Sequence, residues 1–226
     1  RITPLSGDIF AGRYRRGGPT QPLGDVRLLA PVMPSKIVAV GLNYRAHAEE
    51  TGSPLPQEPR IFYKPPSAVI GLGETIVLAA GCERHDHEAE LVAIIGRRAR
   101  NVRPEEALSY VFGYTCGNDV SAKDLQRKDG QYVRAKSFDT FGPLGPFLVT
   151  DLDPSDLQLV VRLNGELAQS TRTSLMNFDC ARIVYVRGSV ASALAIAANE
   201  RDLVAVVLHH QRLARLFDIG AAAIIR

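Results

Sequence analysis

The chain has 226 residues, 46% of them hydrophobic, which is enough to bury the core of a globular domain. Its 27 basic and 24 acidic residues give a formal charge of +3 and are mixed along the sequence, so no basic stripe favours nucleic-acid binding. The three cysteines are far apart, which favours neither a disulfide framework nor a Cys-x-x-Cys metal site. We expect a soluble, cytoplasmic protein, because no apolar run has the ~20 residues of a membrane span and no export signal is evident.

The first strand of the main domain is expected over residues 36–40, which form a β-branched run. A lead-in rich in glycine and proline precedes it over residues 1–35. A helix is expected over residues 43–52, which places His47 and Glu50 one turn apart on one face. An imidazole beside a carboxylate is suited to taking a proton from water, and an ordinary surface pair is the alternative.

A proline-rich segment then holds a cation and a hydroxyl close together. Residues 61–63 predict a short strand, and Lys64 and Ser67 flank the Pro-Pro turn that follows it. This pair is a candidate contact for an anionic substrate, and plain surface exposure is the alternative. A further strand is expected over residues 75–78.

Glu88 and Glu90 stand at the start of an apolar run that extends to Gly96. In an extended strand, residues two apart point to one face about 6.6 Å apart along the chain, so both carboxylates can reach one cation. His85 and His87 then fall on the opposite face from Asp86 and the two glutamates, which favours an all-oxygen site for a hard cation over a zinc site. The alternative is the solvated face of an edge strand.

A third carboxylate is expected at the end of the next strand. Pro104 starts a short helix, and residues 111–119 predict a strand that ends at Asp119. Together with the two glutamates, Asp119 completes a shell of three carboxylates of the type that binds Mg²⁺ or Ca²⁺. Capping of the following turn is the alternative role for Asp119.

The next segment contains further candidate binding groups. Residues 121–124 resemble a capping box, which predicts a short helix that bears Lys123 and Gln126. Lys136 precedes two Gly-Pro turns, where it is a candidate to stabilise negative charge on a substrate oxygen, with a solvated loop lysine as the alternative. The dipeptide Asn-Gly at 164–165 predicts a β-hairpin.

Five motifs, in this order and spacing, resemble the catalytic domain of the fumarylacetoacetate hydrolase family. They are VGLNYRAH at 40–47, FYKPPS at 62–67, HEAEL at 87–91, NDVSAKDLQ at 118–126 and RAKSFD at 134–139. The resemblance covers residues 36–180, which we expect to form the catalytic domain. It implies a β-rich α+β fold, a roll of mixed sheets with a few short helices, and assembly as a homodimer.

The resemblance also implies roles for individual residues. It implies Mg²⁺, or otherwise Mn²⁺ or Ca²⁺, on Glu88, Glu90 and Asp119. It implies that His47 and Glu50 activate water, that Lys136 stabilises an enolate or oxyanion, and that Lys64, Ser67, Lys123 and Gln126 contact the substrate. Family members commonly have arginine where this chain has Lys123, which keeps the charge and loses the bidentate geometry.

The sequence departs from the family after about residue 180. Family members continue into a helix, a Gly-Asp strand and a Thr-Gly-Thr-Pro loop, and residues 181–226 contain no such loop. An apolar stripe at helical spacing runs from Leu203 to Phe217, so we expect a largely helical tail. His209 and His210 are expected to be surface or core residues and not ligands. Our hypothesis is an out-of-frame or replaced C-terminus, and the absence of a Thr-Gly-Thr-Pro segment from the other reading frames of the coding DNA would contradict it.

These observations predict a metal-dependent hydrolase that cleaves a carbon–carbon bond in 2-oxo or 1,3-dicarbonyl acids, such as acylpyruvates. Isomerisation of hydroxymuconate-type diacids and decarboxylation of oxaloacetate are alternatives within the family. A non-catalytic protein with an incomplete site is the alternative from another class, because the tail lacks the loop that closes the family's pocket. The expected partner is a small 2-oxo acid, with no nucleic acid and no membrane.

Overall fold

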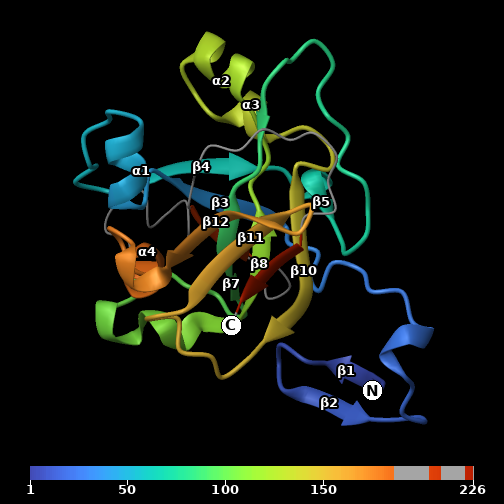
Figure 1. Ribbon diagram of the computed structural model, residues 1–226. Coiled ribbons are helices and arrows are strands. Elements are labelled where there is room, and N and C mark those ends of the chain that lie inside the picture. Colours follow the sequence, from blue (N-terminus) through green and yellow to red (C-terminus); the bar gives the residue numbers. More distant parts are fainter. Residues whose placement is uncertain (186–203, 210–221, 226) are drawn as a thin grey trace.

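The computed structural model describes residues 1–185 and the backbone of Val204–His209 and Ala222–Ile225 (Figure 1). The strands are β1 (Leu5–Asp8), β2 (Arg13–Arg16), β3 (Lys36–Gly41), β4 (Arg60–Lys64), β5 (Val69–Ile70), β6 (His85–Asp86), β7 (Ala89–Ile95), β8 (Val111–Asn118), β9 (Ser121–Ala122), β10 (Gly142–Val149), β11 (Gln158–Leu163), β12 (Glu166–Arg172), β13 (Val204–His209) and β14 (Ala222–Ile225). The α-helices are α1 (Arg45–Glu50), α2 (Lys123–Asp129), α3 (Val133–Lys136) and α4 (Cys180–Tyr185), and the 3₁₀ helices are η1 (Leu23–Asp25), η2 (Pro66–Ala68), η3 (Pro104–Tyr110) and η4 (Thr173–Leu175). No helix within these described ranges has the length and apolarity needed to cross a membrane.

Seven strands form the main sheet, in the order β4-β3-β13-β7-β8-β10-β5. Its central strand β7 is buried on both faces, because Leu91 and Ala93 belong to one core cluster and Val92 and Ile94 to another. A strand that is buried on both faces has a continuous apolar sequence instead of an alternating one. The strand predicted in the apolar run after Glu90 is therefore confirmed.

A smaller sheet, β12-β11-β14, lies over one face of the main sheet (Figure 1). Leu157 and Leu159 pack with Val38 of β3 in the core between these two layers. The hairpin of β11 and β12 is the predicted one, since Asn164 and Gly165 have φ values of 51° and 84°, as a type I′ turn requires. The mixed sheets with a few short helices confirm the expected β-rich α+β fold.

In Figure 1, α2 and α3 lie at the top of the view, and α1 lies at the left, beside β4. α1 follows β3, as predicted, and Gly52 stands just beyond it with a left-handed φ of 62°. α2 and α3 follow the two-residue strand β9. α2 is the short helix predicted to bear Lys123 and Gln126, and α3 ends at Lys136.

Two local predictions are wrong in the middle of the chain. Residues 75–78 form no strand, and Val77 is 63% exposed, because this apolar segment pairs with no neighbouring strand among the described residues. The capping box is also wrong, because Ser121 lies in β9 and its side chain does not cap α2. The helix expected at Pro104 is present in 3₁₀ form as η3.

The tail differs from the helical prediction where the structure describes it. Val204–His209 forms β13, which lies between β3 and β7, parallel to the first and antiparallel to the second. Ala222–Ile225 forms β14, antiparallel to β11. A valine-rich run satisfies both an apolar helical stripe and a buried strand, and here pairing with two neighbouring strands decides for the strand. The remainder of the predicted stripe, with His210 and Phe217, lies outside the described residues.

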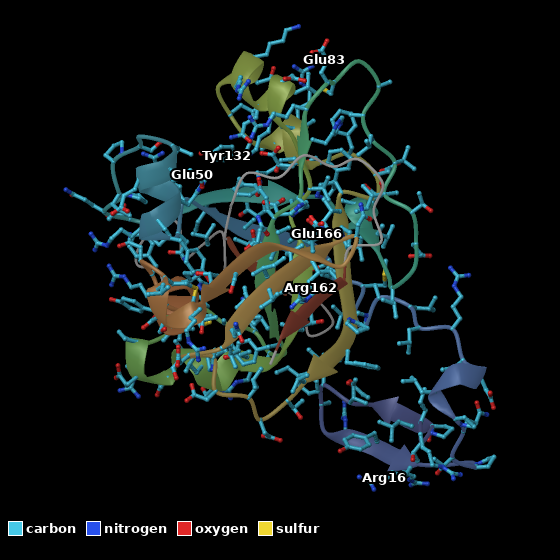
Figure 2. The ribbon with its side chains drawn as sticks, viewed as in Figure 1. Arg16, Glu50, Glu83, Tyr132, Arg162 and Glu166 are labelled. Carbon is cyan, nitrogen blue, oxygen red and sulfur yellow. The ribbon has the colours of Figure 1, made fainter. Side chains whose placement is uncertain are left out.

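The N-terminal hairpin of β1 and β2 projects away from the two larger sheets (Figure 1). Both strands are exposed throughout their length, and Arg16 lies at the outer end (Figure 2). Phe10, in the turn of this hairpin, contacts Phe112 of β8 with a ring-centroid distance of 4.6 Å. This aromatic contact joins the N-terminal segment to the main sheet.

Candidate metal centre

Glu88, Glu90 and Asp119 meet where β7 begins and β8 ends. Antiparallel pairing sets Glu90 opposite Gly117, and the backbone N–H of Asp119 donates a hydrogen bond to the carbonyl of Glu88 at 2.9 Å. One carboxylate oxygen from each of the three residues lies within 4.8 Å of the other two. None of the three residues is more than 1% exposed. The structure thus brings together the three carboxylates that the sequence singled out.

Two buried lysines contact this carboxylate cluster. The ammonium group of Lys136 donates hydrogen bonds to Glu88 Oε2 at 2.6 Å and to Asp119 Oδ2 at 2.5 Å. The ammonium group of Lys64 donates to Asp119 Oδ1 at 2.6 Å and to the backbone carbonyl of Lys136. The structure therefore places Lys64, a predicted substrate contact, against one of the candidate metal ligands.

The other oxygen of Glu88 is held by residues near the start of α2. Ser121 Oγ and Lys123 Nζ each donate a hydrogen bond to Glu88 Oε1 at 2.9 Å. Lys123 also donates to Gln126 Oε1 at 3.3 Å, so two predicted substrate contacts touch each other beside the cluster. Sequence reasoning missed the role of Ser121, because a serine before a helix is typical of a cap.

Burial and neighbouring charges act in opposite directions on the two lysines. Burial lowers the pKa of Lys64, and the attraction of Asp119 offsets this only in part. Burial also acts to lower the pKa of Lys136, but Asp119 and Glu88 outweigh it, so the pKa of Lys136 lies above its usual range. Lys136 therefore keeps its proton at neutral pH and provides a fixed positive charge and hydrogen-bond donor.

The strand predicted to lead into the apolar run is interrupted. β6 pairs with β9 and ends at Asp86, and β7 begins only at Ala89. Arg84 donates to both carboxylate oxygens of Asp86, at 3.0 and 2.9 Å. Asp86 is therefore held by an ion pair and is not part of the carboxylate cluster.

Helix α1 follows β3 and bears the two predicted catalytic residues His47 and Glu50. Burial raises the pKa of Tyr44, the residue before α1, and the negative charge of Glu90 raises it further. His47 is 5% exposed, whereas Glu50 is exposed at the end of the helix (Figure 2). Ser67, in η2, is exposed as well. The roles of His47 and Glu50 in catalysis and of Ser67 in substrate binding stay predictions.

The donor set of the cluster fits a hard divalent cation. Carboxylate oxygens are the ligands that Mg²⁺ and Ca²⁺ prefer. Two oxygens on opposite sides of one Mg²⁺ are about 4.2 Å apart, because each bond is ~2.1 Å long. At most one pair among three ligands can be opposite, and neighbouring oxygens around Mg²⁺ are about 3.0 Å apart. Separations of at most 4.8 Å would therefore have to shorten by up to ~2 Å around a bound ion.

A small cavity of about 10 Å³ lies next to the cluster, with room for about one water molecule. Lys64 and Asp119 form the charged part of its wall, and Ile37 and Leu144 form the apolar part.

Comparison with known proteins shows which family the chain resembles. Residues 36–193 match the family model described as fumarylacetoacetate (FAA) hydrolase C-terminal, and residues 1–31 match a model described as Rv2993c-like, N-terminal. The solved structure of 2-hydroxyhepta-2,4-diene-1,7-dioate isomerase from Mycobacterium marinum is 36% identical, with a TM-score of 0.82 over 99% of this chain and 82% of that chain.

Two further relatives are named as an isomerase and a tautomerase. The 5-carboxymethyl-2-hydroxymuconate delta-isomerase from Mycobacterium smegmatis is 40% identical, with a TM-score of 0.78 over 99% of this chain and 88% of that chain. The mitochondrial oxaloacetate tautomerase FAHD2B of Bos taurus is 42% identical over 172 residues, which are 74% of this chain and 55% of the bovine protein. The match over residues 36–193 and these identities show that the chain is an enzyme of the fumarylacetoacetate hydrolase family.

Proposed function

We propose that this enzyme moves a proton between carbon and oxygen in a 2-oxo or 2-hydroxy dicarboxylic acid. A divalent cation, which we take to be Mg²⁺, is held by Glu88, Glu90 and Asp119 in this proposal. The main supporting observation is the buried cluster in which Lys136 contacts two of the three carboxylates. The activities named for three relatives, two isomerases of unsaturated hydroxy-polycarboxylic acids and one oxaloacetate tautomerase, also support it.

Positive charge at the 2-oxygen is the main requirement of this chemistry. When bound, the cation supplies a Lewis acid that makes the enol or enolate form of a 2-oxo acid less costly. Lys136, which keeps its proton, stabilises the negative charge that develops on the 2-oxygen. Lys123 and Gln126 lie together beside Glu88 and are the proposed contacts for a substrate carboxylate.

His47 is the proposed group that takes the proton from carbon and returns it. Histidine is the side chain that most often acts as a general acid or base. His47 is 5% exposed and lies in α1, the helix that follows β3. The reaction is balanced within the substrate, because the proton removed from one atom is added to another and no water is consumed.

Hydrolysis of a carbon–carbon bond is the second candidate function. It is favoured by the position of His47 and Glu50 one turn apart on α1, with the histidine buried and the carboxylate exposed to solvent. In this reaction His47 would take a proton from water, and the hydroxide would attack the distal carbonyl. The bond to C3 would then break with its electron pair left on C3, and His47 would return the proton to C3 to release pyruvate or a similar acid. Water incorporation therefore separates the two candidates.

The deciding experiment is a substrate panel with and without metal. Oxaloacetate, a 2-hydroxy-diene diacid and an acylpyruvate are followed by ultraviolet absorbance in Mg²⁺ and in EDTA. We expect faster loss of the enol or diene signal with Mg²⁺ and no enzymatic rate in EDTA. Activity that is unchanged by EDTA contradicts the metal-dependent proposal, and cleavage of acylpyruvate that exceeds isomerisation of the diacids favours the hydrolase.

A matched pair of variants connects this activity to the cluster. Glu90→Gln removes a buried carboxylate of the cluster, and Glu83→Gln changes an exposed glutamate near α2 (Figure 2). We expect Glu90→Gln to lose Mg²⁺-dependent activity and Glu83→Gln to retain it, because only Glu90 offers a ligand oxygen. Light scattering on the same samples tests the expected homodimer.

A further inference from the structure

The backbone around Glu88 lies outside the regular hydrogen-bond ladders of the sheets. Residues 87 and 88 fall in the gap between β6 and β7. The N–H of Glu88 donates to the side-chain oxygen of Asn118 at 3.0 Å, and its carbonyl accepts from the N–H of Asp119 at 2.9 Å. The conformation of this candidate ligand therefore depends on individual contacts in place of a continuous strand.

Gln169 supplies two of these contacts from the other sheet. It lies in β12 and is 1% exposed. Its side-chain oxygen accepts a hydrogen bond from the N–H of Ala89 at 3.0 Å, and its side-chain nitrogen donates to the carbonyl of His87 at 3.4 Å. One amide group thus contacts the backbone on both sides of Glu88.

We infer that Gln169 is a positioning residue for Glu88 and so for metal binding, an inference that rests on the proposed function. A side-chain amide has both a donor and an acceptor, so Gln169 makes with the backbone of His87 and Ala89 the two kinds of hydrogen bond that a strand partner would make. Fixing the peptide groups before and after Glu88 fixes the direction in which its carboxylate points. Groups that orient metal ligands typically change metal affinity by about 10–100-fold when they are removed.

A substitution at Thr173 provides a control that distinguishes an effect on metal binding from a general loss of stability. Thr173 is 2% exposed and follows β12 directly. Its hydroxyl accepts from the N–H of Leu157 at 2.8 Å and donates to the carbonyl of Pro154 at 2.6 Å. Thr173→Val therefore removes two buried contacts to backbone beside the end of β12, neither of them to the residues that flank Glu88, and is a matched control.

The test measures the dissociation constant of Mn²⁺ by electron paramagnetic resonance for folded, full-length protein. We expect Gln169→Leu to weaken Mn²⁺ binding by about 10–100-fold, and Thr173→Val to leave it unchanged although the thermal midpoint falls. Gln169→Glu keeps the acceptor for Ala89 and loses the donor to His87, so its affinity should lie between those of the wild type and Gln169→Leu. Hydrogen exchange at the Ala89 amide should become faster in Gln169→Leu.

Three results overturn the inference. Equal Mn²⁺ affinity in Gln169→Leu and the wild type shows that the amide does not act through Glu88. Equal weakening in Thr173→Val and Gln169→Leu shows a general loss of structure. If Gln169→Leu does not fold, wild-type affinity in Gln169→Glu contradicts the inference on its own. If the proposed metal site itself is wrong, the wild-type protein will bind no Mn²⁺, and this result is distinct from the three above.

Discussion

The ammonium group of Lys64 lies 2.6 Å from Oδ1 of Asp119, and the two side chains are 1% and 0% exposed. Arg27 and Glu74 form a surface ion pair of nearly equal length, 2.7 Å, with side chains that are 72% and 35% exposed. Loss of one partner should therefore change the free energy of unfolding much more for the buried pair than for the surface pair. Removing one partner inside the protein leaves a charge that water cannot reach, whereas water and salt replace a lost partner at the surface.

Lys64→Met should therefore lower the free energy of unfolding by about 3–5 kcal/mol, and Arg27→Met by less than ~1 kcal/mol. Urea unfolding in EDTA measures both, so that no bound metal compensates for the lost charge. The double variant Lys64→Met/Asp119→Asn should regain part of the loss, because it also removes the negative charge whose Oδ1 has lost its partner, while Oδ2 still accepts from Lys136. Equal costs for the two single variants would contradict this account.

The stability of the protein should depend on the protonation of His85. Its Nε2 accepts a hydrogen bond from the N–H of Ala79 at 3.1 Å, which requires a neutral ring. Burial lowers the pKa of His85 although Asp124 and Asp86 act to raise it. Because the unfolded chain then binds more protons, stability should be complete above the unfolded pKa of ~6.5 and should fall as the pH drops toward the folded pKa.

The variant His85→Gln tests this pH dependence. A glutamine oxygen can accept the same hydrogen bond from Ala79 and does not titrate. Urea unfolding of both proteins in EDTA, at pH values on either side of ~6.5, should show a smaller loss of stability on acidification for the variant. The same pH dependence in both proteins would assign the effect to other groups.

The sequence predicts those parts of the site that depend on local pattern. The apolar run after Glu90 and the strand that ends at Asp119 were sufficient to predict β7 and β8, whose pairing brings the carboxylates together. The gap between β6 and β7 depends on β9, which pairs with β6 from a distant part of the chain. The same is true of Gln169, which lies in an ordinary hairpin strand and has no local sign of its contacts with His87 and Ala89.

The error in the tail has a related cause. The valine-rich run in Val204–His209 is compatible with a helix and with a strand, and its pairing with both β3 and β7 decides the outcome. Such pairing is a property of the assembled sheet and not of the segment. Local pattern therefore predicts the existence of elements better than it predicts their partners.

The carboxyl group of Asp156 should titrate unusually low for an exposed residue. Arg172 and Ser174 each donate a hydrogen bond to Oδ1 of Asp156 at 2.6 Å, and Arg172 also donates to Oδ2 at 2.7 Å. These hydrogen bonds hold the pKa of Asp156 at about 2. The stability that these hydrogen bonds provide should be present above the unfolded pKa of ~3.9. It should be lost as the pH falls through the lower pKa that Asp156 has in the folded protein.

An NMR titration of the Asp156 carboxyl carbon measures this directly. Arg172→Gln should raise the midpoint toward ~3.9, because the largest stabilising hydrogen bonds are lost. Arg162→Gln, on the neighbouring strand β11 (Figure 2), should leave the midpoint unchanged, because Arg162 donates to the carbonyl of Gly165 and not to Asp156. A midpoint that is insensitive to Arg172→Gln would show that the ion pair does not persist in solution.

Gly117 lies opposite Glu90 in the pairing of β7 and β8, and a side chain there should disturb the carboxylate cluster. A Cβ atom added to Gly117 would lie 2.6 Å from Cγ2 of Val92 and 3.6 Å from Cβ of Glu90. Val92 is 0% exposed, so it cannot move into solvent to relieve the overlap. Gly117→Ala should therefore lower the free energy of unfolding by about 1–3 kcal/mol and should also weaken Mn²⁺ binding.

A double-mutant cycle tests whether the overlap with Val92 is the cause. Val92→Ala removes the methyl group that Gly117→Ala would strike, so the double variant should be less destabilised than the sum of the two single variants. The expected coupling is about 0.5–3 kcal/mol, measured by urea unfolding of all four proteins in EDTA. Mn²⁺ affinity should recover in the double variant, because the two strands can then approach again beside Glu90. Additive costs without recovery of Mn²⁺ binding would mean that a shift of the backbone, and not the contact with Val92, makes alanine unfavourable at Gly117.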